Sequence, residues 1–394
     1  MIYLDNSATT PVKKEVVDEM LPYFTSFYGN PSSLYKLSRD AKRKLEEARE
    51  KVAKIIGAEK DEIYFTASGT ESDNWAIKQI ARANKKKGNH IITTKIEHHA
   101  VLHTCMELEK EGFEVTYLDV DSEGKINIGD IEKHIKGTTI LITIMYANNE
   151  IGVIMPIAEI GNIAREKGIV FHTDAVQAVG KLNIDVVKEN IDLLSLSGHK
   201  FNGPKGVGAL YIKKGTKINS FMHGGGQEKG KRAGTENVPG IIGLAKALEL
   251  SVENREEKNK KLVELRDYLI DTVLSEVPHS RLNGDRVDRL PNNANFCIRF
   301  IEGESLLLGL DNFGICASSG SACTSGSLDP SHVLLAIGLP HEIAHGSLRL
   351  TLSDETTKEE IDFTIEKLKE IIQRLRAMSP LYEDFMKNGG NSDV

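Results

Sequence analysis

The stretch LLSLSGHKFNGPKGVGALYI, residues 193–212, contains two short apolar runs separated by a turn rich in glycine and polar residues. Short apolar runs bounded by such turn residues are typical of β-strands. The stretch therefore predicts strands over Leu193–Ser197 and Val207–Ile212, joined by a compact connection.

The same pattern recurs upstream, with helical spacing between the runs. Further candidate strands are Ile63–Thr66, His90–Thr94, Glu114–Leu118, Thr139–Tyr146 and Val170–Thr173. Several of them are nearly continuous Ile, Val and Leu, as strands covered on both faces tend to be. Between two of them Ile157, Ile160 and Ile163 keep the spacing of one helix face. Alternation of strands and helices predicts an α/β fold, with a mostly parallel central sheet flanked by helices.

After Gly240 the pattern changes to charged amphipathic helices and isolated strands. The elements expected there are helices around Ala245–Ser251 and Leu262–Val273, strands Asn295–Phe300 and Ser347–Leu352, and a last helix that begins with Thr357 and Glu360 spaced as a capping box. We expect a large domain over residues 15–253 and a smaller α+β domain formed by residues 1–14 and 254–394.

Composition and charge exclude several classes of protein. The 394 residues carry a formal net charge of -7, and the basic runs lie among polar or acidic neighbours, so we expect no nucleic-acid binding. No apolar stretch approaches the roughly 18 residues that a membrane span needs, and no signal peptide is recognisable, so we expect a cytoplasmic protein without membrane contact. The four cysteines form no CxxC pair, which predicts neither a disulfide scaffold nor a metal site.

A lysine ends the motif Ser197–Lys200, directly after a predicted strand. A lysine at a strand end, among small residues that let a planar ring approach, is well placed to bind an aldehyde cofactor as an imine. The alternative is a solvated surface charge, because lysine is seldom buried.

Asp174 and Gln177 follow the strand Val170–Thr173. A carboxylate at a strand's carboxyl end can lie against a pyridinium nitrogen and keep it protonated, and Gln177 could reach a ring oxygen. The alternative is that Asp174 is a helix N-cap and Gln177 an exposed helix residue.

Small residues over Ala67–Ser72 follow the strand Ile63–Thr66 and precede a helical pattern. Such a strand-to-helix turn directs backbone N–H groups outward at the positive end of a helix and predicts phosphate binding; the alternative is an ordinary capped helix start. Taken together, these three loops at strand ends predict a pyridoxal-phosphate site.

Cys323 lies in a run of small polar residues, Ser318–Ser327. Such a composition does not pack a core, so we expect this thiol to be presented rather than buried, in a loop over residues 317–330. We expect Cys297, inside an apolar strand, and Cys105, in a helix, to be buried and inert. Cys316 lies close to the loop and could be either, with a structural role favoured.

At this point the sequence resembles the NifS/IscS-type cysteine desulfurases, which belong to the fold type I, or aspartate-aminotransferase-like, pyridoxal-phosphate enzymes. The resemblance covers nearly the whole chain. Its motifs are YLDNSATTP (Tyr3–Pro11), GNPSS (Gly29–Ser33), ESDN (Glu71–Asn74), NNEIG (Asn148–Gly152), HTDAVQA (His172–Ala178), SGHK (Ser197–Lys200), HGGGQE (His223–Glu228), AGTEN (Ala233–Asn237) and SSGSACTSG (Ser318–Gly326). The extended loop around Cys323 resembles the NifS/IscS group, whereas the SufS-like group has a short cysteine loop.

The resemblance implies a role for each matching residue of the cofactor site. Lys200 would bind the cofactor covalently, Asp174 would hold the pyridinium nitrogen, and Gln177 would bind the phenolic oxygen. The phosphate would be held by Gly69, Thr70, Ser197 and His199. Thr235 would reach the phosphate of a neighbouring subunit, which implies a homodimer with composite sites. Gly69 precedes Thr70 where many relatives have Gly-Ala-Thr, which leaves open the backbone group that binds the phosphate.

Further residues are implied on the substrate side. His98 matches the histidine that stacks on the ring and moves protons, although His99 beside it could be confused with it from sequence. Asn149 matches a residue that contacts cofactor and substrate, and Arg349 one that binds the substrate carboxylate, a role that suits a planar guanidinium. Without the motifs, a surface histidine and a surface ion pair would be the ordinary interpretations.

The implied activity is conversion of L-cysteine to L-alanine, with the sulfur left on Cys323 as a persulfide. The implied sulfur acceptors are iron–sulfur cluster scaffolds and carriers for tRNA thiolation. Two alternatives stay open: a selenocysteine lyase, another lyase or an aminotransferase of the same fold, and a catalytically inactive scaffold for iron–sulfur assembly. Retention of Lys200, Asp174 and Cys323 argues against the inactive scaffold.

Overall fold

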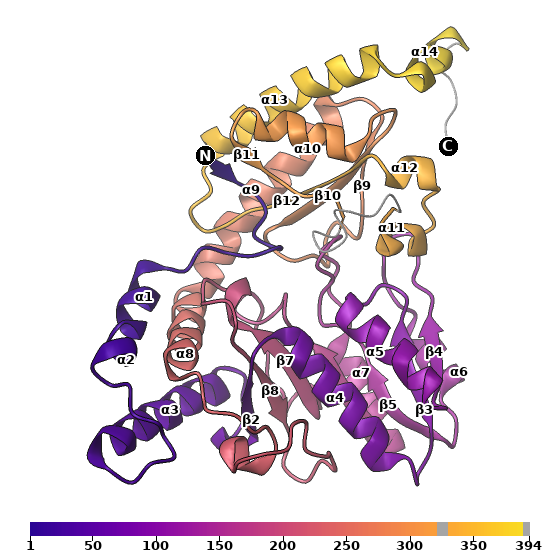
Figure 1. Ribbon diagram of the computed structural model, residues 1–394. Helices are drawn as coiled ribbons and strands as arrows, with labels where there is room; N and C mark the ends of the chain where they lie inside the picture. Colours follow the sequence, from indigo (N-terminus) through magenta and orange to yellow (C-terminus); the bar gives the residue numbers. More distant parts are fainter. Residues whose placement is uncertain (321–329, 389–394) are drawn as a thin grey trace.

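The computed structural model describes residues 1–320 and 330–388 and has two lobes (Figure 1). The large lobe is built on a seven-stranded sheet in the order β2-β8-β7-β6-β5-β3-β4. Its strands are β2 (Ile63–Thr66), β3 (His90–Thr94), β4 (Glu114–Leu118), β5 (Thr139–Thr143), β6 (Val170–Asp174), β7 (Leu193–Ser197) and β8 (Gly208–Ile212). All the predicted strands of this region are therefore present.

Pairing within this sheet is mostly parallel, as predicted. β3 pairs in parallel with β4 and β5, β5 with β6, and β6 with β7. β8 alone runs against its neighbours, β7 and β2. The reason lies in the connection after β7, because a parallel crossover needs about a dozen or more residues and the stretch from Gly198 to Val207 is shorter.

Helices cover both faces of the sheet. α4 (Gly69–Asn84) and α5 (His99–Lys110) pack on one face, and α3 (Lys36–Ile55), α7 (Ile157–Lys167) and α8 (Val238–Val252) pack on the other. Neighbouring residues of β7 point to opposite faces of the sheet. Leu193 packs in the apolar core under α4 and α5, and Leu194 packs in the core under α3, α7 and α8. This double coverage explains why the strand sequences are apolar without strict alternation.

β5 ends at Thr143, three residues before the predicted strand end. Beyond it, Ile144 and Tyr146 still donate to backbone oxygens of β6. The backbone N–H of Met145, however, donates to both carboxylate oxygens of the buried Glu97 at 3.0 Å rather than to a backbone oxygen. A side-chain acceptor so distant in sequence cannot be read from the local pattern, which is why the prediction ran too long.

The small lobe contains a three-stranded antiparallel sheet in the order β12-β10-β9. Its elements are β9 (Ser280–Leu282), β10 (Asn293–Ile298), β12 (Ser347–Thr351), α9 (Arg255–Glu276), α10 (Gly303–Asp311), α13 (Lys358–Ala377) and α14 (Pro380–Lys387). β10 ends before the predicted Phe300, whose φ of 68° is outside the strand region. The capping box that begins α13 is present, as predicted.

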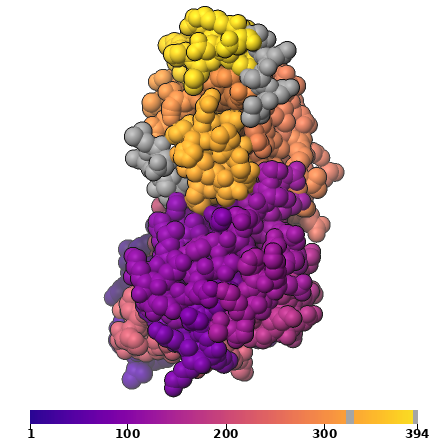
Figure 2. All heavy atoms as spheres, turned by 90° about the vertical axis from the view of Figure 1, so that its right-hand side faces the viewer, coloured from indigo at the N-terminus to yellow at the C-terminus, as the bar shows by residue number. Residues whose placement is uncertain are grey.

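The first residues of the chain belong to the small lobe. β1 (Ile2–Tyr3) pairs in parallel with β11 (Ile315–Cys316), and Leu4 lies in the same apolar core as α9 and α13. This separate core supports the division expected at residues 14 and 253, which stays a prediction. In the space-filling view the small lobe, in orange and yellow, lies directly against the purple part of the large lobe (Figure 2).

The remaining elements are short. They are α1 (Lys14–Met20), α2 (Pro22–Thr25), η1 (Lys60–Glu62), α6 (Ile128–His134), η2 (Gly198–Lys200), η3 (Gln227–Gly230), α11 (His332–Ala336) and α12 (His341–Ala344). Of the helices described, none has the length and apolar character required to cross a membrane.

Candidate active site

A cavity of about 210 Å³ lies where β6 and β7 end and α4 begins. The predicted site residues that line it are Gly69, Thr70, His98, Asn149, Asp174, Gln177, Ser197, His199, Lys200 and Arg349. The other lining residues are Ser7, Ala8, Ser68, Asp73, Met145, Ala147 and Val176. Residues from the start, middle and end of the chain thus meet around one hollow.

Lys200 ends the short helix η2, directly after β7. Its Nζ donates hydrogen bonds to the backbone oxygens of Ser7 at 2.6 Å and Ala8 at 2.8 Å. Lys200 is therefore not the solvated surface charge of the alternative interpretation. The two carbonyls were missed as site groups, although they belong to the YLDNSATTP motif.

Asp174 is the last residue of β6 and is only 7% exposed. Burial raises the pKa of its carboxyl to about 6, against the opposing effects of a hydrogen bond from the Val176 backbone N–H at 2.9 Å and the positive charge of Lys200. No helix begins after Asp174, so the N-cap alternative is wrong. Gln177 is also buried; its Nε2 donates to the Ser7 oxygen at 3.0 Å, and its Oε1 has no partner among the described residues.

A second buried acid, Asp73 of α4, lines the same cavity. Its carboxylate lies 3.6 Å from His172 Nε2, and burial, followed by the negative charge of Asp174, raises its pKa well above the usual value. Burial lowers the pKa of His172 to about 3, so this ring is neutral. Of the two acids, Asp73 is therefore the one that binds a proton more readily, which favours Asp174 as the charged acid. Asp73 was not predicted as a site residue, although it lies in the ESDN motif.

The turn between β2 and α4 places the start of the helix against the Asp174 segment. Ser68 caps α4, its Oγ accepting from the Glu71 backbone N–H at 3.1 Å. A Cβ on Gly69 would lie 2.6 Å from a methyl group of Val176, so glycine is required for this approach. The backbone N–H groups at the start of a long helix form a suitable site for an oxyanion. The neighbouring His199 is neutral, because burial and the charge of Lys200 lower its pKa to about 4.

His98 and His99 occupy different surroundings. His98 caps α5, its Nδ1 accepting from the Ala100 backbone N–H at 3.1 Å, and it lines the cavity. Burial and the charge of Lys200 lower its pKa to about 4, so the ring is neutral and, with Nδ1 as an acceptor, carries its proton on Nε2. His99 instead lies with its ring 4.9 Å from that of His103 and 4.7 Å from that of His332. The structure therefore distinguishes two histidines that the sequence did not.

Arg349 lies in β12 of the small lobe and is 1% exposed. Its Nη1 donates to the backbone oxygen of Asn149 at 3.0 Å and its Nη2 to Asp5 at 2.9 Å. Its Nε is buried and has no partner among the described residues. A guanidinium held in this way has a donor left to contribute to the binding of an anion in the cavity.

Cys323 lies outside the described residues, but the residues before and after its segment are described. Ser331 donates a hydrogen bond to the buried carboxylate of Glu150, and a Cβ on Gly320 would lie 2.8 Å from the same carboxylate. Ser318 exchanges backbone hydrogen bonds with Arg349 at 3.3 and 2.6 Å. The described residues on both sides of the segment therefore contact either Arg349, which lines the cavity, or Glu150, which follows the lining residue Asn149 in the chain.

The remaining predicted residues lie away from the cavity. Thr235 is exposed and does not line it. Cys105 and Cys297 are buried, as predicted, and burial raises the pKa of both thiols, that of Cys297 to about 11. Neither of these two thiols would ionise near neutral pH.

Known proteins resemble the chain over nearly its whole length. A family model described as Aminotransferase class-V matches residues 2–363. A cysteine desulfurase IscS from Clostridium botulinum is 62% identical over 389 residues, 98% of each chain. Another cysteine desulfurase IscS, from Methanosarcina thermophila, is 60% identical over 380 residues, 96% of this chain and 94% of the relative. A solved structure described as a NifS-like protein has a TM-score of 0.89 at 40% identity, covering 94% of this chain and 99% of that one.

Proposed function

The chain belongs to the aminotransferase class-V family and is a cysteine desulfurase, and from this we propose that it converts L-cysteine to L-alanine with pyridoxal phosphate on Lys200 and Cys323 as the sulfur acceptor. The observation that carries the proposal is the meeting of Lys200, Asp174 and Arg349 in one cavity, with Arg349 bonded to Ser318, five residues before Cys323 in the chain. Sulfur supply for iron–sulfur cluster assembly is the corresponding role.

The side chains around the cavity fit pyridoxal phosphate. Gln177 Oε1 is a buried acceptor with no partner among the described residues, as expected for a group that binds a protonated or hydroxylated ring atom. Asp174 would hold the ring nitrogen, the turn at Gly69 and Thr70 the phosphate, and Lys200 the aldehyde. The bound cofactor would supply an electron sink for the substrate Cα.

The protein's own groups would then move the protons. The Lys200 amine, once neutral, takes the proton from the substrate Cα, and its two carbonyl partners at residues 7 and 8 orient it. His98 is neutral at physiological pH and carries its proton on Nε2, so it would act on the substrate as a hydrogen-bond donor through this N–H. Arg349 would hold the substrate carboxylate and so fix the orientation of the substrate in the cavity.

Sulfur transfer needs the thiolate of Cys323. An unperturbed thiol has a pKa of about 8.5, so a neighbouring base must increase the ionised fraction. The thiolate attacks the substrate sulfur, a sulfur–sulfur bond forms, and the carbon–sulfur bond breaks. The substrate carbon gains a proton and leaves as L-alanine, while the sulfur remains on Cys323 as a persulfide. The carbon is reduced and the sulfur oxidised, so no external oxidant is required.

The test is incubation of the purified protein with L-cysteine, with alanine and protein-bound persulfide measured in the same samples. We expect the two products in equal amounts during the first turnover. A keto acid in place of alanine would indicate the aminotransferase alternative, and no product would indicate an inactive scaffold. A much faster reaction with L-selenocysteine, without dependence on Cys323, would indicate the lyase.

We also infer that the chain forms a homodimer. Large apolar side chains are exposed near its beginning, and they include Phe24, Phe27, Tyr28, Leu34 and Tyr35. Leu34, for example, is 88% exposed. Exposure of several large apolar side chains so close together in the sequence is unusual unless a partner covers them. Sedimentation of the purified protein at twice the mass of one chain is the expected result, and a monomer at micromolar concentration would contradict it.

A cytoplasmic location is inferred as well. The three described cysteines are all free, which agrees with a reducing compartment. The sulfur acceptors proposed are proteins of that compartment, such as an iron–sulfur scaffold. Transfer of radiolabelled sulfur from the loaded protein to a purified scaffold would test this partnership.

A further inference from the structure

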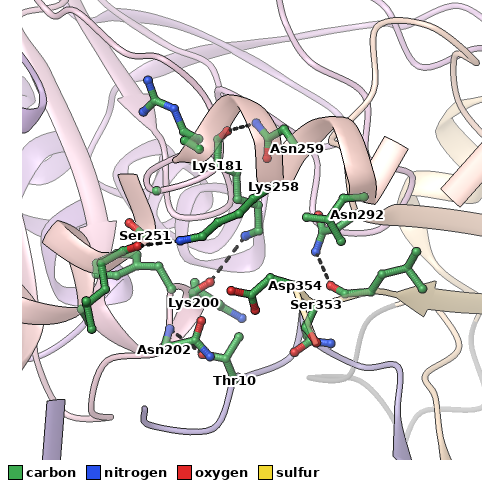
Figure 3. A pocket seen from close by; sticks show the side chains of 18 of the residues that line it. Thr10, Lys181, Lys200, Asn202, Ser251, Lys258, Asn259, Asn292, Ser353 and Asp354 are labelled. Atoms are coloured by element: carbon green, nitrogen blue, oxygen red, sulfur yellow. Dashed lines mark hydrogen bonds between the residues drawn. The ribbon is translucent and has the colours of Figure 1, made fainter. Parts of the chain in front are cut away.

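A second cavity, of about 90 Å³, lies at the junction of the two lobes (Figure 3). We call it the basic cavity and define it by Lys13, Lys181, Arg255 and Lys258, all of which line it. A volume of roughly 10–15 Å³ of this kind holds one water molecule, so the basic cavity has room for a small ion of several heavy atoms. Lys200 lines both this cavity and the candidate active site.

Positive charge predominates in the basic cavity. Among the described residues that line it, Asp354 is the one carboxylate, and it pairs with Lys13 at 2.8 Å. Lys181, Arg255 and Lys258 therefore have no carboxylate in the described lining to balance them. The excess is local, since the whole chain is acidic with a net charge of -7.

The hydrogen bonds of these three cations go to neutral oxygens. Lys258 Nζ donates to the Leu250 backbone oxygen at 2.9 Å. Lys181 Nζ donates to the backbone oxygens of Gln177 at 3.1 Å and Lys200 at 3.5 Å. Such carbonyls orient an ammonium group without neutralising its charge, and each ammonium has three N–H donors.

Arg255 is oriented in the same way. It donates to the Leu182 backbone oxygen at 2.9 Å and to the side-chain oxygen of Asn183 at 2.8 Å. Burial and the positive charge of Lys200 lower the pKa of the Lys181 amine to about 7, which indicates how unfavourable its charge is without an anion. Half-buried cations that line one cavity, with no counter-ion for them among its described lining residues, are the features of an anion site.

We propose that the basic cavity binds a small anion with phosphate or carboxylate oxygens, at a site separate from the candidate active site. Arginine and lysine are the side chains that most often bind such oxygens in proteins. Phe201, Leu250 and Leu262 form an apolar part of the wall, which leaves space for a short carbon body attached to the acidic group.

An anion in the basic cavity would touch both lobes. Lys258 lies in α9, Lys181 follows the Asp174 segment of the large lobe, and Ser353 and Asp354 belong to the small lobe after β12. Because Lys181 contacts the backbone oxygen of Lys200, the ligand would also stabilise the position of the candidate catalytic lysine. The inference stands apart from the proposed reaction, since binding can be measured without turnover.

The test is a calorimetric titration of the cofactor-loaded protein with inorganic phosphate at constant ionic strength. In that form the cofactor's own phosphate would occupy the turn at Gly69, so added phosphate reports on another site. We expect saturable binding of one phosphate per chain. Lys258→Gln should weaken it at least tenfold, whereas Lys260→Gln, an exposed lysine on the same helix, should leave it unchanged.

Two further measurements make the result decisive. Phosphate should raise the melting temperature of the wild type and of Lys260→Gln, and raise that of Lys258→Gln much less. Arg255→Gln serves as a second variant if Lys258→Gln does not fold. A parallel titration with acetate distinguishes carboxylate from phosphate recognition. No saturable binding of either anion, or equal binding by Lys258→Gln and Lys260→Gln, would overturn the proposal.

Discussion

Replacement of Lys200 by alanine is expected to lower the rate of alanine formation from L-cysteine by at least about 10³-fold, because both the covalent hold on the cofactor and the Cα base would be lost. The measurement is single-turnover alanine production at saturating cysteine. Borohydride reduction followed by mass spectrometry should also find the cofactor attached to the wild type and absent from the variant.

Lys205→Ala is the matched control for this experiment. Lys205 lies in the same glycine-rich turn, but its side chain is exposed and outside the described lining of the site. We expect this variant to retain the rate and the attached cofactor. If Lys200→Ala, still folded by thermal melting, worked within tenfold of the wild type, the proposed role of Lys200 would be wrong.

Replacement of Cys323 by alanine is expected to reduce persulfide formation and sulfur transfer to an acceptor by at least about 10²-fold, because the attacking thiolate is removed. The cofactor should stay attached to Lys200, since the amine of that lysine, and not the thiol of Cys323, is the proposed covalent link. Measurement of protein-bound persulfide after one addition of L-cysteine, by alkylation and mass spectrometry, reports the effect directly.

Cys316→Ala separates this role from a general need for thiols. Cys316 is half-buried in β11, near the same segment, and we expect its loss to leave sulfur transfer within about twofold of the wild type. Full persulfide formation by Cys323→Ala would refute the proposed acceptor. Equal losses in both variants would point to a disturbed small lobe rather than to one reactive thiol.

The fold could be predicted well where local pattern decides it. Strands β2, β3, β4 and β7 have the predicted bounds, because apolar runs and turn residues are properties of neighbouring positions. The end of β5 and the direction of β8 depend instead on the distant carboxylate of Glu97 and on the length of the connection after β7.

The residues of the candidate site likewise fall into those that a local motif predicts and those that depend on contacts between distant parts of the chain. Asp174, Gln177 and Lys200 lie in loops with recognisable motifs, so they could be predicted from the sequence. The contact of Lys200 with Ser7 could not, because it joins residues far apart in the chain and depends on how the first residues cross from one lobe to the other. The basic cavity was missed for a similar reason, since its cations come from separate segments that meet only after packing.

The crossing of the first residues has a consequence for synthesis on the ribosome. β1 pairs with β11, Asn6 donates to the Thr351 backbone oxygen at 2.7 Å, and the next two carbonyls hold Lys200. The amino terminus emerges first, yet its partners near residues 315 and 351 are made last. A nascent chain can therefore complete its large sheet before the carbonyls of residues 7 and 8 are in place to hold Lys200. Catalytic competence is thereby coupled to completion of the polypeptide.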